Sequence, residues 1–185
     1  MIHLYESNRL PASRWRNGGG ETREIVSYPP GAADFDWRIS IATIAADGDF
    51  SLFPGIDRII TLLSGDVALY RHDQLYQPLS LHQPFAFRGE EAISARLSGK
   101  ISTDFNIMAR RSAFLPEAGI ATTRFAPAAI EAGVVYVISG QWQHQQTLLK
   151  AGQGAWWANN AGAFIPVSED AQLLWGTLHL KRPNN

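Results

Sequence analysis

The 185 residues carry 16 Lys and Arg against 17 Asp and Glu, a net charge of -1, and 45% of them are hydrophobic. This balance is typical of a globular protein and gives no electrostatic basis for binding nucleic acid or an anionic membrane. The absence of cysteine excludes disulfides, cysteine zinc sites and thiol catalysis.

The N-terminal sequence predicts a cytoplasmic protein. It lacks the basic start and the apolar run of a secretion signal, and no apolar stretch approaches the roughly 20 residues of a membrane helix. The length fits one large domain or two small barrels joined in one chain.

Residues 15–25, W-R-N-G-G-G-E-T-R-E-I, contain three consecutive glycines before a predicted strand at 21–26. Glycine is favoured where the backbone takes a positive φ or where another group approaches closely. Two interpretations stay open. The glycines form a tight turn into the strand, or their N–H groups bind an anion. Neither phosphate-loop pattern, G-x-x-x-x-G-K or G-x-G-x-x-G, is present.

From residue 21 onward the dominant hydrophobic period is two, which is typical of strands with one buried face. Residues 35–44 show it best, with Phe35, Trp37 and Ile39 on one side and Arg38 and Ser40 on the other. A tight turn is expected at 47–49, a short strand at 50–53 and a type II turn at Pro54 and Gly55.

Residues 59–63 and 67–70 are apolar runs separated by Ser-Gly-Asp, which predicts a buried hairpin. A polar loop at 71–77 and a turn at 88–91 follow, and residues 93–97 and 101–108 are predicted strands. Alternation in the last strand predicts that Asp104, Asn106 and Met108 share one face. The only helical candidate, residues 127–132, is too short for more than a turn or two.

A weak internal repeat relates the two halves of the chain. Residues 59–65, I-I-T-L-L-S-G, resemble residues 134–140, V-V-Y-V-I-S-G, at an offset of 75. Many short predicted strands, about 8–12 residues apart, favour antiparallel sandwiches or jelly rolls. We therefore expect an all-β fold of two antiparallel jelly-roll barrels that share an interface, with residues 1–111 in the first and 112–185 in the second.

The residues of established catalytic chemistries do not form recognisable motifs. Histidines are scattered and make no H-x-H pair, so no metal site is expected, and no serine has a G-x-S-x-G setting. Glu24 is the one carboxylate of interest, as a hydrogen-bond acceptor or a general base beside the glycines. An adjacent Arg23 or Arg38 would keep it ionised and favour the acceptor role.

What remains is a candidate binding face. Arg38 and Ser40 come from one predicted strand, Asp104 and Asn106 from another, and Arg58 precedes an apolar strand. Small-ligand sites combine apolar concavities with a few convergent polar groups. The alternative is that these side chains form the solvated face of a sandwich.

Four segments resemble the HutD/Ves family, in the same order and with similar spacing. They are W-R-N-G-G-G-E-T-R-E-I at 15–25, F-D-W-R-I-S-I-A at 35–42, F-S-L-F-P-G-I-D-R at 50–58 and D-F-N-I-M-A-R at 104–110. The resemblance implies a bicupin that has lost the cupin metal ligands, with Pro54 and Ile56 standing about where a histidine pair would be. It implies neither a metal nor a cofactor.

The same resemblance implies a function. HutD-like proteins are associated with control of histidine utilisation through a small acidic intermediate such as formylglutamate, and Ves-like proteins with stress. We therefore expect a regulatory protein for a small anionic metabolite, homodimeric by analogy with cupin-like barrels. The alternatives are an isomerase or hydrolase with Glu24 as base, and a ligand-free interaction protein. The implied pocket residues are Asn17, Gly18, Gly19, Thr22, Glu24, Arg38, Arg58, Asp104 and Asn106.

Overall fold

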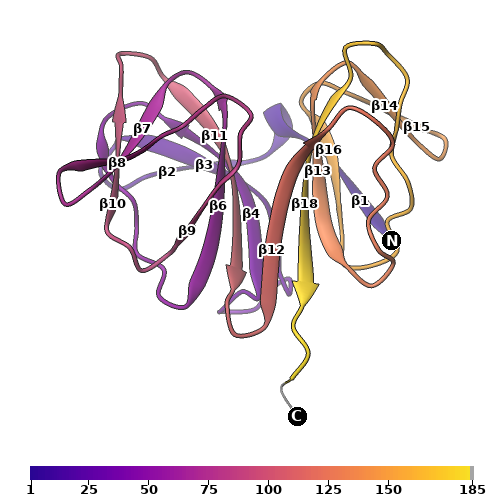
Figure 1. Ribbon diagram of the computed structural model, residues 1–185, viewed down its shortest axis with the longest axis horizontal. Coiled ribbons are helices and arrows are strands. Elements are labelled where there is room, and N and C mark those ends of the chain that lie inside the picture. The colour runs from indigo at the N-terminus through magenta and orange to yellow at the C-terminus, as the bar shows by residue number, and fades with distance from the viewer. Residues whose placement is uncertain (184–185) are drawn as a thin grey trace. The chain divides into compact units, whose positions relative to one another are not determined.

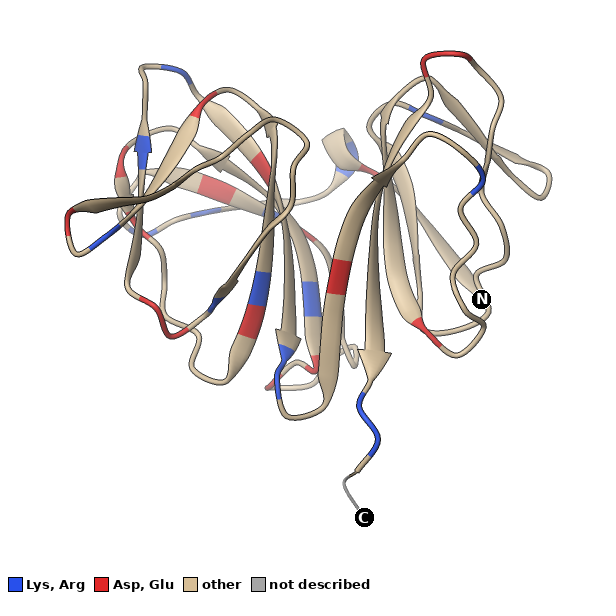
Figure 2. Ribbon diagram, viewed as in Figure 1, with Lys and Arg blue, Asp and Glu red and all other residues tan. Residues whose placement is uncertain are grey.

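The computed structural model describes residues 1–183, and its regular elements are strands apart from one 3-10 turn, Ser7–Arg9 (η1). No α-helix occurs in this range, so the predicted all-β class is confirmed (Figure 1). In particular, the described residues form no helix with the length and apolar character needed to cross a membrane. Acidic and basic residues are interspersed along the ribbon (Figure 2), as the balanced composition leads one to expect.

The contacts divide the chain into two compact units, each described by itself. The first unit is Pro11–Ala113, and the second is Met1–Leu10 together with the chain from Phe114 onward. The first ten residues were expected in the first barrel. They lie in the second unit because their strand pairs with one near residue 155.

The first unit contains two antiparallel sheets. One has the strand order β2-β3-β4-β11-β6-β9 and the other β5-β10-β7-β8. Their bounds are β2 Ala12–Arg14, β3 Gly20–Tyr28, β4 Trp37–Ile44, β5 Gly48–Asp49, β6 Ile56–Ser64, β7 Val67–Arg71, β8 Gln74–Pro78, β9 Phe85–Arg88, β10 Ile93–Leu97 and β11 Ser102–Arg110.

An apolar cluster joins the inner faces of these two sheets. Ile60 and Leu62 of β6 pack with Leu69 of β7 and Ile93 of β10. In the larger sheet Asp104 lies opposite Leu62, and Asn106 lies opposite Ile60. Directly opposed residues of neighbouring strands point to the same face, so the polar residues of β11 face this interior.

Four local predictions for the first unit are wrong. Residues 48–49 form strand β5, which pairs with β10, instead of a turn, and residues 50–53 have no regular structure. Residues 74–78, expected in a loop, form β8. The expected hairpin of β6 and β7 is absent because the two strands lie in different sheets. Between them Gly65 takes φ +87°, and a Cβ there would lie 2.1 Å from Ser102 Oγ.

The second unit also contains two sheets, ordered β1-β16-β13-β18-β12 and β15-β14-β17. Its core includes Trp142, Trp157, Phe164 and Leu149. The helical candidate at 127–132, expected to be no more than a turn or two, forms only a turn at residues 129–130. The strand bounds are β1 Ile2–Glu6, β12 Phe114–Ala121, β13 Ala132–Ser139, β14 Gln141–His144, β15 Thr147–Lys150, β16 Gln153–Trp157, β17 Ile165–Pro166 and β18 Gln172–Leu180.

The internal repeat has a structural counterpart. Gly140, like Gly65, ends a long strand with a positive φ, and the chain then enters the other sheet of its own unit. The next N–H donates to a serine hydroxyl in both places: Asp66 N to Ser102 Oγ and Gln141 N to Ser168 Oγ, each at 2.9 Å. Each unit therefore has a corner of the same geometry between its two sheets.

Candidate functional site

A cavity of about 480 Å³ opens on the inner face of the larger sheet of the first unit. Its walls come from the end of β2 and the segment after it, from β3, β4, β6 and β11, and from β5 and the loop that follows. The lining residues are Arg14, Trp15, Arg16, Asn17, Thr22, Arg38, Ser40, Ala42, Asp49, Phe50, Ser51, Phe53, Arg58, Asp104, Asn106 and Met108.

The strand register explains why polar residues from distant parts of the chain meet here. Met108 of β11 lies opposite Arg38 of β4 on one side and opposite Arg58 of β6 on the other. One cross-strand row therefore carries two arginines on the same face. Asn106 continues this face in the next row, beside Ser40.

Arg58 is held by aromatic rings instead of by a carboxylate. It is 6% exposed, and its guanidinium carbon lies 5.3, 5.4 and 4.9 Å from the ring centroids of Phe50, Phe53 and Phe87. Its Nη2 donates to Asn106 Oδ1 at 3.4 Å, and its buried Nε has no hydrogen-bond partner. Burial lowers the pKa of Arg58 to about 10, so it stays charged at neutral pH.

Asp104 is the buried acid of the site. It is 1% exposed, Asn106 Nδ2 donates to its Oδ1, and its Oδ2 has no hydrogen-bond partner. Burial raises the pKa of Asp104 to about 7, although the positive charge of Arg58 and the hydrogen bond from Asn106 act in the opposite direction. Asp104 therefore titrates near neutrality, next to a permanent cation.

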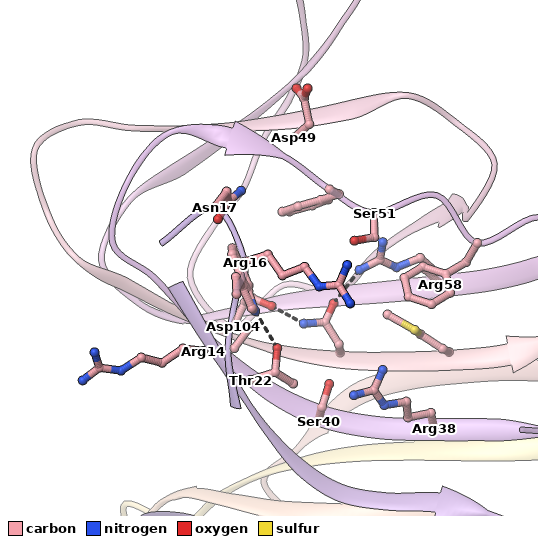
Figure 3. Close-up of a pocket in the computed structure, with 16 residues that line it drawn as sticks. Arg14, Arg16, Asn17, Thr22, Arg38, Ser40, Asp49, Ser51, Arg58 and Asp104 are labelled. Carbon is pink, nitrogen blue, oxygen red and sulfur yellow. Dashed lines mark hydrogen bonds between the residues drawn. The ribbon is translucent and has the colours of Figure 1, made fainter. Parts of the chain in front are cut away.

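Arg38 reaches the cavity with its guanidinium, as Figure 3 shows. Its Nε donates to Glu24 Oε1 at 3.0 Å, and the two side chains are 28% and 49% exposed. Glu24 is not among the residues that line the cavity. Its contact is with Arg38, which it orients from outside.

The glycine triplet forms a turn. Gly18 takes φ +72° and its N–H donates to Trp15 O, while Gly19 N–H donates to Asn17 Oδ1 at 2.8 Å. A Cβ on Gly20 would lie 2.3 Å from Thr43 O. The N–H groups of Gly18 and Gly19 are thus used within the turn, and its effect on the cavity is to place Trp15 and Asn17.

The structure brings six of the nine expected residues to the cavity wall and leaves three outside it. Gly18 and Gly19 lie in the turn, and Glu24 lies behind Arg38. Those that line the cavity are Asn17, Thr22, Arg38, Arg58, Asp104 and Asn106.

The sequence did not indicate that Arg14, Trp15 and Arg16 form one wall of the cavity. It also did not indicate that aromatic rings surround Arg58. Arg14 and Arg16 flank Trp15, whose Nε1 donates to Thr22 Oγ1 at 2.8 Å. The position of Arg16 inside the 15–25 motif was a usable signal. Phe53, in the segment expected to be a short strand at 50–53, contacts the guanidinium of Arg58.

The charges that line the cavity favour an anion. Four arginines stand against two aspartates, and one of these, Asp104, is partly protonated at neutral pH. Figure 3 shows the guanidinium groups of Arg16, Arg38 and Arg58 directed toward the middle of the cavity, with Arg14 directed away. Arginine forks bind carboxylates through paired charge-assisted hydrogen bonds.

The histidines of the described residues lie apart from one another and from this cavity. His144 Nε2 bonds Ala161 O at 2.6 Å in the second unit, and His3 stacks on Trp156. His72 and His82 occupy left-handed backbone positions. Residues 1–183 contain no cluster of three His, Cys, Asp or Glu side chains that could hold a metal ion.

Solved structures similar to the chain share its fold. HutD from Pseudomonas fluorescens SBW25, in a formate condition, is 27% identical, with a TM-score of 0.83 over 98% of this chain and 100% of that one. A conserved protein of unknown function from Pseudomonas aeruginosa PAO1 has a TM-score of 0.85 at 23% identity, over 96% and 98% of the two chains. A cupin 2 conserved barrel domain protein from Leptotrichia buccalis has a TM-score of 0.62 at 14% identity, over 96% of each chain. The fold is therefore cupin-like.

Curated relatives match nearly the whole chain. Protein Ves of Citrobacter koseri is 43% identical over 96% of this chain and 94% of its own length, and Protein Ves of Cronobacter sakazakii is 39% identical over 96% and 98%. The model of the HutD family matches residues 7–175. The chain therefore belongs to the HutD family.

Proposed function

We propose that the chain binds a small carboxylate metabolite in the cavity of the first unit, with Arg38 and Arg58 as the anion-binding groups. One observation carries this proposal: Arg58 is a buried guanidinium that lines a cavity and forms no ion pair with any carboxylate of residues 1–183. A buried charge without a counter-ion is costly. A ligand carboxylate would supply the missing charge and accept from the fork of donors.

The size of the cavity and the family suggest which carboxylate. A volume of about 480 Å³ lies in the range of small-molecule sites. The similarity to HutD and the implied link with histidine utilisation favour an acidic degradation intermediate of the formylglutamate type. The formate condition named for the Pseudomonas fluorescens HutD structure is compatible with carboxylate chemistry.

The wider proposal is a metal-free, cytoplasmic bicupin that acts as a regulator. The matching corners at Gly65 and Gly140 support two related barrels, each of jelly-roll type. Dimerisation is proposed by analogy with cupin-like barrels. A regulatory role is proposed because the HutD-like proteins that the chain resembles are associated with control of histidine utilisation.

A catalytic role is the second candidate, since Asp104 titrates near neutrality inside the cavity. Glu24, the base expected from the sequence, is ion-paired to Arg38 and lies outside the cavity wall. If the protein is an isomerase or hydrolase that uses Glu24, then Glu24→Gln should keep binding and abolish turnover. Absence of turnover in the native protein would remove this candidate.

Thermal unfolding with a ligand panel tests the proposal. The panel is N-formylglutamate, formiminoglutamate, urocanate, histidine and glutamate. A ligand at about 100 times its Kd should add roughly 2.7 kcal/mol, and each kcal/mol should raise Tm by about 2–4 °C in a chain of this size.

The variants make this test specific. Arg58→Ala should lose the ligand-induced shift. Arg96→Ala, which removes an exposed arginine stacked on Tyr70 and paired with Asp73 in the same unit, should keep it. A native protein whose Tm no member of the panel changes would contradict carboxylate binding and favour a protein-only partner.

A further inference from the structure

We propose that the cavity takes up its anion together with a proton, and that Asp104 holds this proton. The inference rests on the proposed carboxylate binding and adds a pH dependence to it. Asp104 is then a specificity-determining residue, because its protonation decides whether the site can accept a second negative charge.

The surroundings of Asp104 leave its charge poorly compensated. On β4 it lies opposite Ala42 and on β6 opposite Leu62, so both neighbouring strands present apolar side chains to it. Its one hydrogen bond comes from the Asn106 amide, and Oδ2 is buried without a partner. No ion pair joins it to an arginine within the described part of the chain.

Charged groups from several elements lie in or near the cavity around this carboxyl, and most of them are cations. The nearest is Arg58, whose charge reaches Asp104 across the amide of Asn106. The neighbouring strand β3 contributes the neutral Thr22 to the wall and Glu24 behind Arg38. The other charged residues of the cavity are Arg38 from β4, Asp49 from β5, and Arg14 and Arg16 from the segment before the glycines.

While the cavity holds no anion, the charges of Arg58 and Asp104 act on each other across the amide of Asn106 without forming an ion pair. A ligand carboxylate on Arg58 would place a second negative charge beside Asp104, which is itself 1% exposed. Two carboxylates that share one such site cannot both stay ionised without a large cost.

The proton then goes to the weaker acid of the two. A free ligand carboxyl has a pKa of roughly 4, whereas burial raises that of Asp104 to about 7. Binding therefore raises the pKa of Asp104 further. Affinity should be greatest below the pKa of the free site, fall as pH rises above about 7, by up to about tenfold per pH unit, and level off above the pKa of the complex.

The test is a calorimetric titration with N-formyl-L-glutamate from about pH 5.5 to about pH 8.5, a range in which both ligand carboxyls stay ionised. The proteins are the native chain, Asp104→Asn, and Asp73→Asn as the matched control. Asp73 is 96% exposed and has φ +59°, a backbone position that asparagine tolerates well. Each titration is repeated in two buffers of different ionisation enthalpy, which counts the protons taken up.

The native protein and Asp73→Asn should lose affinity above pH 7 and show a buffer-dependent enthalpy, while Asp104→Asn should show a flat profile and an enthalpy independent of buffer. A flat native profile would overturn the inference, as would an unchanged slope in Asp104→Asn. If Asp104→Asn does not fold, the buffer dependence of the native enthalpy still decides whether a proton is taken up. Absence of binding at every pH would instead contradict the proposed function itself.

Discussion

The two units of the chain share a strand-corner geometry but differ in what fills them. Each has a glycine corner whose following N–H donates to a serine hydroxyl at 2.9 Å. The second unit fills its core with Trp142, Trp157 and Phe164, whereas the first buries Arg58, Asp104 and Asn106 beside a cavity.

This difference separates an interior filled by aromatic side chains from one that keeps buried charges beside a cavity. Aromatic packing removes apolar area from water and leaves no space for a ligand. Buried charges weaken folding unless a partner compensates them, and this is why we propose that a ligand binds in the cavity beside them. Of the three buried polar atoms that lack a partner in residues 1–183, two belong to Arg58 and Asp104.

The largest expected effect is on stability, when a large side chain is removed from the aromatic core of the second unit. Phe164 is fully buried, and its ring lies 5.6 Å from that of Trp157 and 4.7 Å from that of His144. Phe164→Ala should lower the free energy of unfolding by about 3–5 kcal/mol, measured by urea denaturation. A loss below 1 kcal/mol would show that this interior is not tightly packed.

Removing Arg58, the buried cation of the cavity, should act mainly on ligand binding. Arg58→Ala should weaken carboxylate binding by about 100-fold or more, because the charge-assisted fork of a buried guanidinium is lost. Titration calorimetry at about pH 6 measures this, with Arg96→Ala as control. Equal affinities in the two variants would mean that the anion binds elsewhere.

Asp104, the buried acid of the cavity, should make the free energy of unfolding depend on pH. Unfolded Asp has a pKa of roughly 3.9, and burial raises that of Asp104 to about 7. The folded state therefore holds the extra proton between these values, so stability falls as pH rises from about 4 to about 7 and then levels off. Asp104→Asn should remove this fall and gain on the order of 1–3 kcal/mol at about pH 8. Denaturation across this pH range with no difference between the two proteins would contradict the assignment.

The smallest effect is expected at the rim of the cavity. Glu24→Gln removes the partner of Arg38, but both side chains are substantially solvent-accessible, and such pairs contribute about 0–1 kcal/mol. We expect a change in carboxylate affinity of less than about fivefold, measured by calorimetry. A loss as large as that of Arg58→Ala would place Glu24 in the binding site.

The sequence predicts the polar face of the first unit better than it predicts the strand connections. Alternation alone placed Asp104 and Asn106 on one side of a strand, since the side-chain period of a strand is two. The pairing of β6 with β11 and β9 instead of β7 depends on long-range register, which local patterns do not encode. The same limit explains why residues 48–49, a turn by composition, pair with β10.

For the cavity too, the sequence indicates which residues take part but not how they are arranged in space. Arg38 and Arg58 were identified from local pattern and resemblance, but their shared row opposite Met108 follows from the pairing of three strands. The aromatic surroundings of Arg58 join residues 50, 53 and 87, which no short motif connects. The sequence does not decide whether the glycines form a turn or bind a ligand, because the answer depends on which acceptors their N–H groups meet.

A crystal structure with N-formylglutamate bound would test the central claim most directly. We predict a ligand carboxylate in the cavity of the first unit, within hydrogen-bond distance of the Arg58 and Arg38 guanidinium groups, with no ligand in the aromatic core of the second unit. A ligand ordered elsewhere on the protein, with the cavity unchanged and Arg58 still without a carboxylate partner, would contradict it.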